Sequence, residues 1–147
     1  MKNITKYASI IAFVLSLLGL FYLIKNNLII SKNLLAIAIQ SASVVLMIWS
    51  RITFGIKSFN ASSNTIKEKL VTNGPYKWLR HPIYAAIIYF FIGCLIAYPN
   101  IKTLIAVIVI VICTYVRMLL EEKELLIAFK DYAQYSKKVK RIIPFVF

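Results

Sequence analysis

Residues 81–122 read HPIYAAIIYFFIGCLIAYPNIKTLIAVIVIVICTYVRMLLEE, and this stretch decides the fold. It contains two long apolar runs, about 83–98 and 101–120, with only a short link around Pro99 between them. Proline and asparagine in so short a link predict a tight turn between two helices. Two helices joined in this way must be antiparallel neighbours. We therefore expect the two ends of the stretch, 81–84 and 117–122, to meet at one depth.

The rest of the chain is equally apolar. Two further runs, about 7–24 and 34–49, approach the roughly 20 residues that a membrane-spanning helix needs. The 147 residues are 61% hydrophobic and 16% charged, whereas a soluble domain is about 45–50% apolar and about 25% charged. No useful strand pattern appears, and backbone in lipid must be helical or form a closed barrel. The sequence predicts an all-α integral membrane protein, a bundle of about four transmembrane helices.

We expect a single membrane domain over residues 1–147. Residues 1–50 hold the two N-terminal spans, 51–82 a polar loop, and 83–147 the helical hairpin with an amphipathic C-terminal tail. The first span is expected to be retained, because its apolar run is longer than that of a signal peptide and no small-residue cleavage site follows it.

The net charge of +13 has a one-sided distribution. Fifteen of the 18 basic residues fall in the N-terminus, the loop and the tail, which alternating spans place on one face; the other face carries Lys25, Lys32 and Lys102. The positive-inside rule then predicts that both termini and the loop are cytoplasmic. With so little polar surface, this charge does not indicate nucleic-acid binding. We expect it to hold anionic lipid headgroups.

The scarce ionisable residues gather where the two hairpin helices end. Four of the chain's five acidic residues lie between Glu121 and Asp131, and the only histidine is His81. Each has a structural explanation: His81 can cap a helix, and Arg117 can pair with Glu121 four residues on. Their coincidence at a membrane boundary, where an unpaired carboxylate is costly, nevertheless predicts a functional site. The cluster comprises His81, Tyr84, Arg117, Glu121 and Glu122.

These residues belong to a pair of motifs. The segment 74–84, GPYKWLRHPIY, is followed after one hairpin by Arg117-x-x-x-Glu121-Glu122. This arrangement resembles the membrane methyltransferases that include isoprenylcysteine carboxyl methyltransferase and the phospholipid N-methyltransferases. The tail is similar too, with spaced aromatic residues at 129, 132 and 135 and a basic segment before Pro144. The resemblance covers about residues 69–147. Ala86 and Lys130 stand where the family often has glycine.

The resemblance implies an S-adenosylmethionine site at the cytoplasmic face. The implied cofactor contacts are Lys69, Leu70, Val71, Tyr76, His81, Pro82, Ile83, Tyr84 and Glu121. It ties Arg117 to the substrate or its reacting group, and His81 is a second catalytic candidate that can accept a proton. The cofactor carries a net positive charge, so Glu122 joins Glu121 as a candidate for its ammonium or ribose. Methyl transfer needs no metal, and the four glycines of the chain form no dinucleotide-binding fingerprint.

The acceptor is expected to be lipid-like or membrane-associated; a carboxylate, a phospholipid amine and a thiol all stay open. The tail is expected to form a lid at the interface. Two other functions are compatible with the sequence. Sterol reductases, which bind NADPH, have a similar Arg-His-Pro-x-Tyr stretch and a similar Ile-Ile-Pro ending. A small membrane subunit without activity is the third.

Overall fold

The computed structural model describes residues 2–30, 32–55 and 70–146; Lys69 and much of the predicted loop lie outside these ranges. The described residues form helices and contain no strand. In chain order the elements are α1 (Lys2–Lys25), α2 (Leu34–Phe54), the 3-10 helix η2 (Gly74–Lys77), α3 (Pro82–Ala97), α4 (Ile101–Ala128) and α5 (Tyr132–Lys138). The prediction of an all-α membrane bundle is confirmed.

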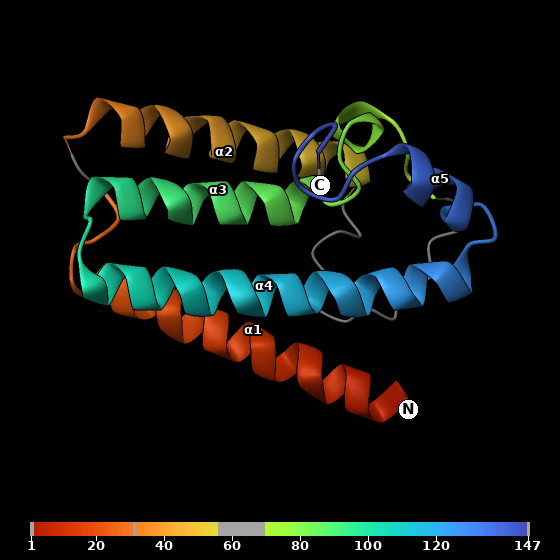
Figure 1. The fold of residues 1–147 in the computed structure, drawn as a ribbon, viewed down its shortest axis with the longest axis horizontal. Coiled ribbons are helices and arrows are strands. Elements are labelled where there is room, and N and C mark those ends of the chain that lie inside the picture. The colour runs from red at the N-terminus through yellow and green to blue at the C-terminus, as the bar shows by residue number, and fades with distance from the viewer. Residues whose placement is uncertain (1, 31, 56–69, 147) are drawn as a thin grey trace.

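The hairpin of α3 and α4 lies at the centre of the bundle (Figure 1). α2 packs along α3, and α1 crosses α4 on the other side. The predicted link at 98–100 joins the central helices, and the Asn100 side chain caps α4 by accepting a hydrogen bond of 2.9 Å from the backbone N–H of Thr103. Pro82 occupies the first turn of α3, where its missing N–H costs nothing.

Two helices run beyond their predicted ends. α2 continues to Phe54 because nothing breaks it before Gly55, and Arg51 is therefore helical. α4 continues from the predicted residue 120 to Ala128, since its Glu, Lys and Leu residues are strong helix formers. The polar end of α4 thus extends past the apolar segment and carries the site residues on a rigid element.

Three described helices, α1, α2 and α4, are long and apolar enough to cross a membrane, and α3 is a shorter apolar helix of 16 residues. Their outward side chains are apolar as well: Ile11 and Phe21 of α1 are 59% and 63% exposed. Such surface is unfavourable in water and suits lipid. The chain is an integral membrane protein.

The polar residues of α2 serve helix packing. Gln40 donates to the Ile29 carbonyl at 2.8 Å and contacts Cys94 Sγ at 3.3 Å. A Cβ at Gly93 would lie 2.7 Å from Gln40 Cγ, so glycine lets α2 and α3 approach closely. Ser43 bonds to the Ile39 carbonyl of its own helix. Gln40 and Ser43 therefore already have partners within the bundle.

Candidate functional site

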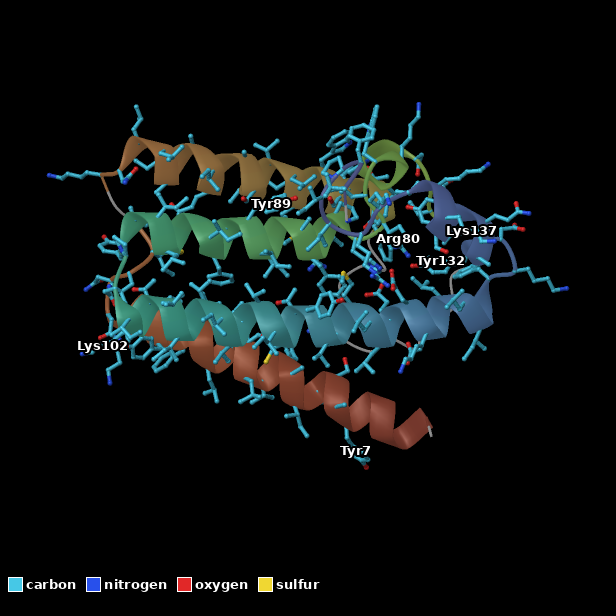
Figure 2. The ribbon with its side chains drawn as sticks, in the orientation of Figure 1. Tyr7, Arg80, Tyr89, Lys102, Tyr132 and Lys137 are labelled. Atoms are coloured by element: carbon cyan, nitrogen blue, oxygen red, sulfur yellow. The ribbon has the colours of Figure 1, made fainter. Side chains whose placement is uncertain are left out.

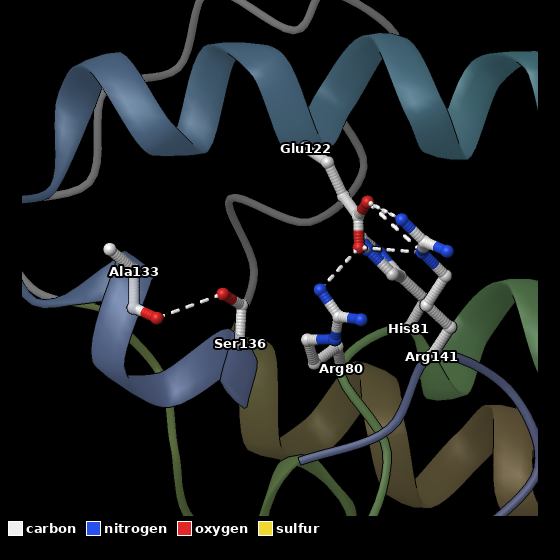
Figure 3. A network of polar contacts seen from close by, with 6 residues as sticks. All are labelled: Arg80, His81, Glu122, Ala133, Ser136 and Arg141. Carbon is white, nitrogen blue, oxygen red and sulfur yellow. Dashed lines mark hydrogen bonds and ion pairs between the residues drawn. The ribbon is translucent and has the colours of Figure 1, made fainter. Parts of the chain in front are cut away.

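The carboxylate of Glu122 is the centre of a buried ionic cluster (Figure 3). Its Oε1 lies 2.7 Å from Arg80 Nη1 and 3.2 Å from His81 Nε2. Its Oε2 lies 2.9 Å from Arg141 Nη2, and Arg141 Nε adds contacts of 3.1 and 3.2 Å. We call these four residues, Arg80, His81, Glu122 and Arg141, the Glu122 clamp. Both carboxylate oxygens are taken, so Glu122 is fully paired within the protein.

The clamp joins segments that are far apart in sequence. Arg141 belongs to the tail, which runs back past α5 and lies beside the residues preceding α3. Leu79 and Lys140 form a parallel bridge there, and the N–H of Arg80 donates to the Lys140 carbonyl at 2.7 Å. The N–H of His81 donates to the Arg141 carbonyl at 3.0 Å. The backbone pairing fixes the register that brings Arg141 to Glu122.

Three tyrosines secure the tail further. The Tyr135 hydroxyl donates to the Tyr76 carbonyl at 2.6 Å, and the Tyr89 hydroxyl donates to the Ile142 carbonyl. Tyr132 is 2% exposed beside the clamp. Burial, together with the nearby Glu122 carboxylate, raises the pKa of the Tyr132 phenol to about 12. Tyr132 is therefore neutral throughout the physiological range.

Glu121 has different surroundings from its neighbour. Successive residues of a helix point about 100° apart, and Glu121 lies on the side of Tyr84, close enough for its carboxylate to act electrostatically on the Tyr84 hydroxyl. Tyr76 lies close enough for its phenol to respond to the same carboxylate. Burial, then Glu121, raises the pKa of the Tyr76 phenol above its ordinary value. Arg51 of α2 acts electrostatically on both tyrosines.

Arg117 lies one turn before Glu121 and completes this second group, which we call the Glu121 cluster: Arg51, Tyr76, Tyr84, Arg117 and Glu121. Its Nε is buried and has no hydrogen-bond partner among the described residues. Its guanidinium carbon lies 4.8 Å from the centre of the Phe13 ring of α1. In the described part of the chain no carboxylate comes within ion-pair distance of Arg117, so the pairing with Glu121 that helix spacing allows is not formed.

The expected meeting of the hairpin ends is thus observed, but it produces two groups rather than one. His81 and Glu122 belong to the clamp, while Tyr84, Arg117 and Glu121 belong to the Glu121 cluster. The His81 ring lies 5.7 Å from the Tyr84 ring and connects the two.

The remaining candidates lie before and at the start of α3. Leu70 and Val71 are partly buried before η2, Pro82 is buried at the start of α3, and Ile83 is partly buried beside it. Tyr76 is buried in η2, with its ring 5.7 Å from that of Phe54. Lys69 lies outside the described residues.

Sequence reasoning missed three contributors. The sequence assigns Arg51 and Arg141 only to the basic residues that set the topology, and it gives Phe13 no role beyond its place in the first apolar run. The one available signal was charge balance: two adjacent carboxylates at a membrane boundary need more cations than His81 and Arg117 supply.

The fold and these groups define a class: a helical integral membrane protein with ionisable residues clustered at one end of its bundle. Residues 28–132, more than two thirds of the chain, match the Phospholipid methyltransferase family model, and the chain belongs to this family. The resemblance to membrane methyltransferases of the isoprenylcysteine and phospholipid type is confirmed, and the family is one of enzymes. No curated protein and no solved structure matches the chain.

Proposed function

We propose that this protein transfers a methyl group from S-adenosylmethionine to a lipid-like or membrane-associated acceptor, and that the Glu121 cluster is its cofactor site. The observation that carries the proposal is that the two adjacent glutamates have different surroundings. Two arginines and His81 occupy Glu122, whereas Glu121 lies near two tyrosines. Arg117, in the same cluster, has a buried, unpaired Nε.

The chemistry of the Glu121 cluster fits the cofactor. S-adenosylmethionine carries a sulfonium, an ammonium and a carboxylate. Glu121 offers a carboxylate to the ammonium, and the rings of Tyr76 and Tyr84 offer aromatic faces to the sulfonium or the adenine. The unpaired Nε of Arg117 supports its role toward a carboxylate or the reacting group of the acceptor.

When bound, the cofactor would supply an activated methyl group whose transfer to an acceptor lone pair would leave the electron pair of the carbon–sulfur bond on sulfur. Glu121 and Tyr84 hold the reactants in line, and the apolar helices exclude water. Such alignment can supply about 7–11 kcal/mol. Arg117 orients the acceptor, which makes it the catalytic residue of the proposal.

His81 has a supporting part in this proposal. An ionised carboxylate only accepts hydrogen bonds, so the Nε2–H of His81 donates a hydrogen bond to Glu122. Because this nitrogen already bonds to Glu122, we assign His81 and Glu122 a positioning role. They fix the start of α3, and thereby the position of Tyr84. Proton removal from an amine or thiol acceptor would fall to another group.

The proposed acceptor enters from the bilayer. The family acts on lipid-type substrates, and the outward faces of the helices are apolar. We propose the cytoplasmic side for the site. Arg80, Tyr132 and Lys137 lie at one end of the bundle and Lys102 at the other (Figure 2), and the end with most of the basic residues is the cytoplasmic one under the positive-inside rule.

The test is a calorimetric titration of S-adenosylmethionine into the purified protein. Glu121→Gln should weaken binding about tenfold or more, since a hydrogen bond to a charged group contributes about 1.5–3 kcal/mol. Asp131→Asn, an exposed site with the same loss of charge, should bind as the wild type does. Labelled cofactor and a membrane lipid extract then identify the methylated product. Binding of NADPH in place of S-adenosylmethionine would reject the proposal in favour of a reductase, and binding of neither would favour a subunit without activity.

A further inference from the structure

A separate groove lies between η2 and the tail. It has a volume of about 220 Å³ and is lined by Lys77, Trp78, Lys138, Val139, Lys140 and Phe145. None of these residues belongs to the Glu122 clamp or the Glu121 cluster. The methyl-transfer proposal leaves this groove without a role.

The groove is strongly basic. All three lysines are exposed, and within the described residues no carboxylate lies at ion-pair distance from any of them. Lys77 Nζ lies 5.9 Å from the centre of the Trp78 ring, at cation–π distance from its aromatic face. Three unneutralised ammonium groups around one groove favour an anion.

One wall of the groove is aromatic and exposed. The rings of Trp78 and Phe145 meet edge to face with centroids 5.9 Å apart, although 50% of Trp78 and 79% of Phe145 remain exposed. Phe145 has a φ of 65°, a left-handed conformation that is uncommon for a bulky residue. Val146 beside it is 71% exposed. The wall therefore presents apolar surface next to the lysines.

The position of the groove relative to the membrane favours a lipid as its ligand. The bridge between Leu79 and Lys140 ties its two sides together immediately before Pro82, where the apolar helix α3 begins. Trp78 and the lysines therefore lie at the boundary of the apolar zone, where tryptophan is enriched and lysine attracts anionic headgroups. A small soluble anion would pair with the lysines but would make no contact with the apolar wall.

We propose that this groove binds the headgroup of an anionic phospholipid. The phosphate lies among Lys77, Lys138 and Lys140, and the glycerol and first acyl carbons lie against Trp78 and Phe145. The site does not depend on the methyl-transfer proposal.

The experiment uses Trp78 as the probe. Trp49→Phe leaves Trp78 as the only tryptophan, and this variant is placed in phosphatidylcholine nanodiscs that contain a small fraction of brominated lipid. Bromine quenches an indole that it touches. Brominated phosphatidylglycerol should quench Trp78 at a mole fraction about fivefold or more below that needed for brominated phosphatidylcholine, because each lysine near a membrane surface favours an anionic lipid about fivefold.

Two triple variants in the same background locate the effect. Lys77→Gln/Lys138→Gln/Lys140→Gln should abolish the preference for phosphatidylglycerol. The matched control, Lys123→Gln/Lys130→Gln/Lys137→Gln, removes three exposed charges at the same end of the bundle and should retain it. Circular dichroism verifies that both remain helical.

Three outcomes would overturn the proposal. They are equal quenching by the two lipids in the parent protein, equal loss of the preference in both triple variants, and displacement of the preference by millimolar inorganic phosphate at constant ionic strength. The second would indicate a diffuse basic surface, and the third a soluble anion.

Discussion

Glu121 and Glu122 are chemically identical neighbours that the helix directs to different surroundings. Glu122 is 7% exposed and contacts side chains from two segments, Arg80 and His81 before α3 and Arg141 in the tail. Removing one partner from a buried ionic group leaves the others uncompensated and costs about 3–5 kcal/mol. We therefore expect replacement of Glu122 to lower stability, and replacement of Glu121 to weaken cofactor binding without lowering stability.

Glu122→Gln should lower stability by about 3–5 kcal/mol and the thermal midpoint in detergent by about 10 °C. Hydrogen exchange should also increase over residues 139–143, because the tail loses its ionic anchor. Glu121→Gln is the matched control and should unfold within about 1 kcal/mol of the wild type. A Glu122→Gln protein that melts with the wild type would show that the clamp does not stabilise the fold.

Tyr132 predicts a pH dependence in the alkaline range. Its pKa is about 12 in the folded protein and about 10 in an unfolded chain. Its contribution to stability is complete below pH 10 and is lost as the pH rises through 12, because the unfolded state ionises first. Tyr132→Phe removes this term, whereas all other titrating groups are shared with the wild type. The stability difference between the two proteins should be constant to about pH 9 and shift by about 1.4 kcal/mol at pH 11. Thermal melts from pH 8 to 11 measure it, and a constant difference throughout would contradict the assignment.

At the scale of elements, the close approach of η2 to the end of α2 requires glycine at position 74. Gly74 has a φ of 56°, and a Cβ there would lie 2.7 Å from Thr53 Oγ1. Any other residue meets both a backbone cost and a steric one. Because η2 carries Tyr76 into the Glu121 cluster, this turn positions part of the proposed cofactor site.

Gly74→Ala should destabilise the protein by about 2–4 kcal/mol, of which the left-handed backbone accounts for about 1–2 kcal/mol. Adding Thr53→Ala removes Oγ1 and Cγ2 and should recover the steric part only. A double-mutant cycle of thermal stability measures the coupling between the two sites. Additive effects would mean that the contact between η2 and α2 is relieved by movement of the turn.

The hairpin shows how far sequence reasoning reaches for such elements. A link around Pro99 and the length of the apolar runs were sufficient to predict that His81 meets Glu122. The link and the run lengths could not place Arg141. Its position depends on backbone pairing between Leu79 and Lys140, and nothing in the sequence pattern relates these two residues. The link and the run lengths also could not place Arg51 or Phe13. In lipid every face of a helix is apolar, so periodicity does not reveal which face turns inward, and packing decides it.

At the scale of the whole molecule, the Glu121 cluster takes residues from η2, α2, α3 and α4, and α1 contacts one of them. Arg51 comes from α2, Tyr84 from α3 and Glu121 from α4, while α1 contributes Phe13 beneath Arg117. The family match begins at residue 28, so α1 lies outside it. α1 nevertheless packs along α4 and contacts Arg117, the residue proposed to orient the acceptor (Figure 1). Under the proposed function, α1 therefore affects the orientation of the acceptor rather than the binding of the cofactor.

This difference gives a prediction for α1. Phe13→Ala removes an arginine–aromatic contact worth about 0.5–2 kcal/mol, and Arg117 then loses a fixed orientation. The rate of methyl transfer at saturating S-adenosylmethionine should fall about 2- to 30-fold, while the Kd for the cofactor changes less than about twofold. Phe21→Ala, at a position of the same helix that is 63% exposed, is the matched control and should leave both values unchanged. Equal losses in cofactor binding and transfer would instead mean that α1 supports the whole cluster, and an unchanged rate would mean that Arg117 is oriented without it.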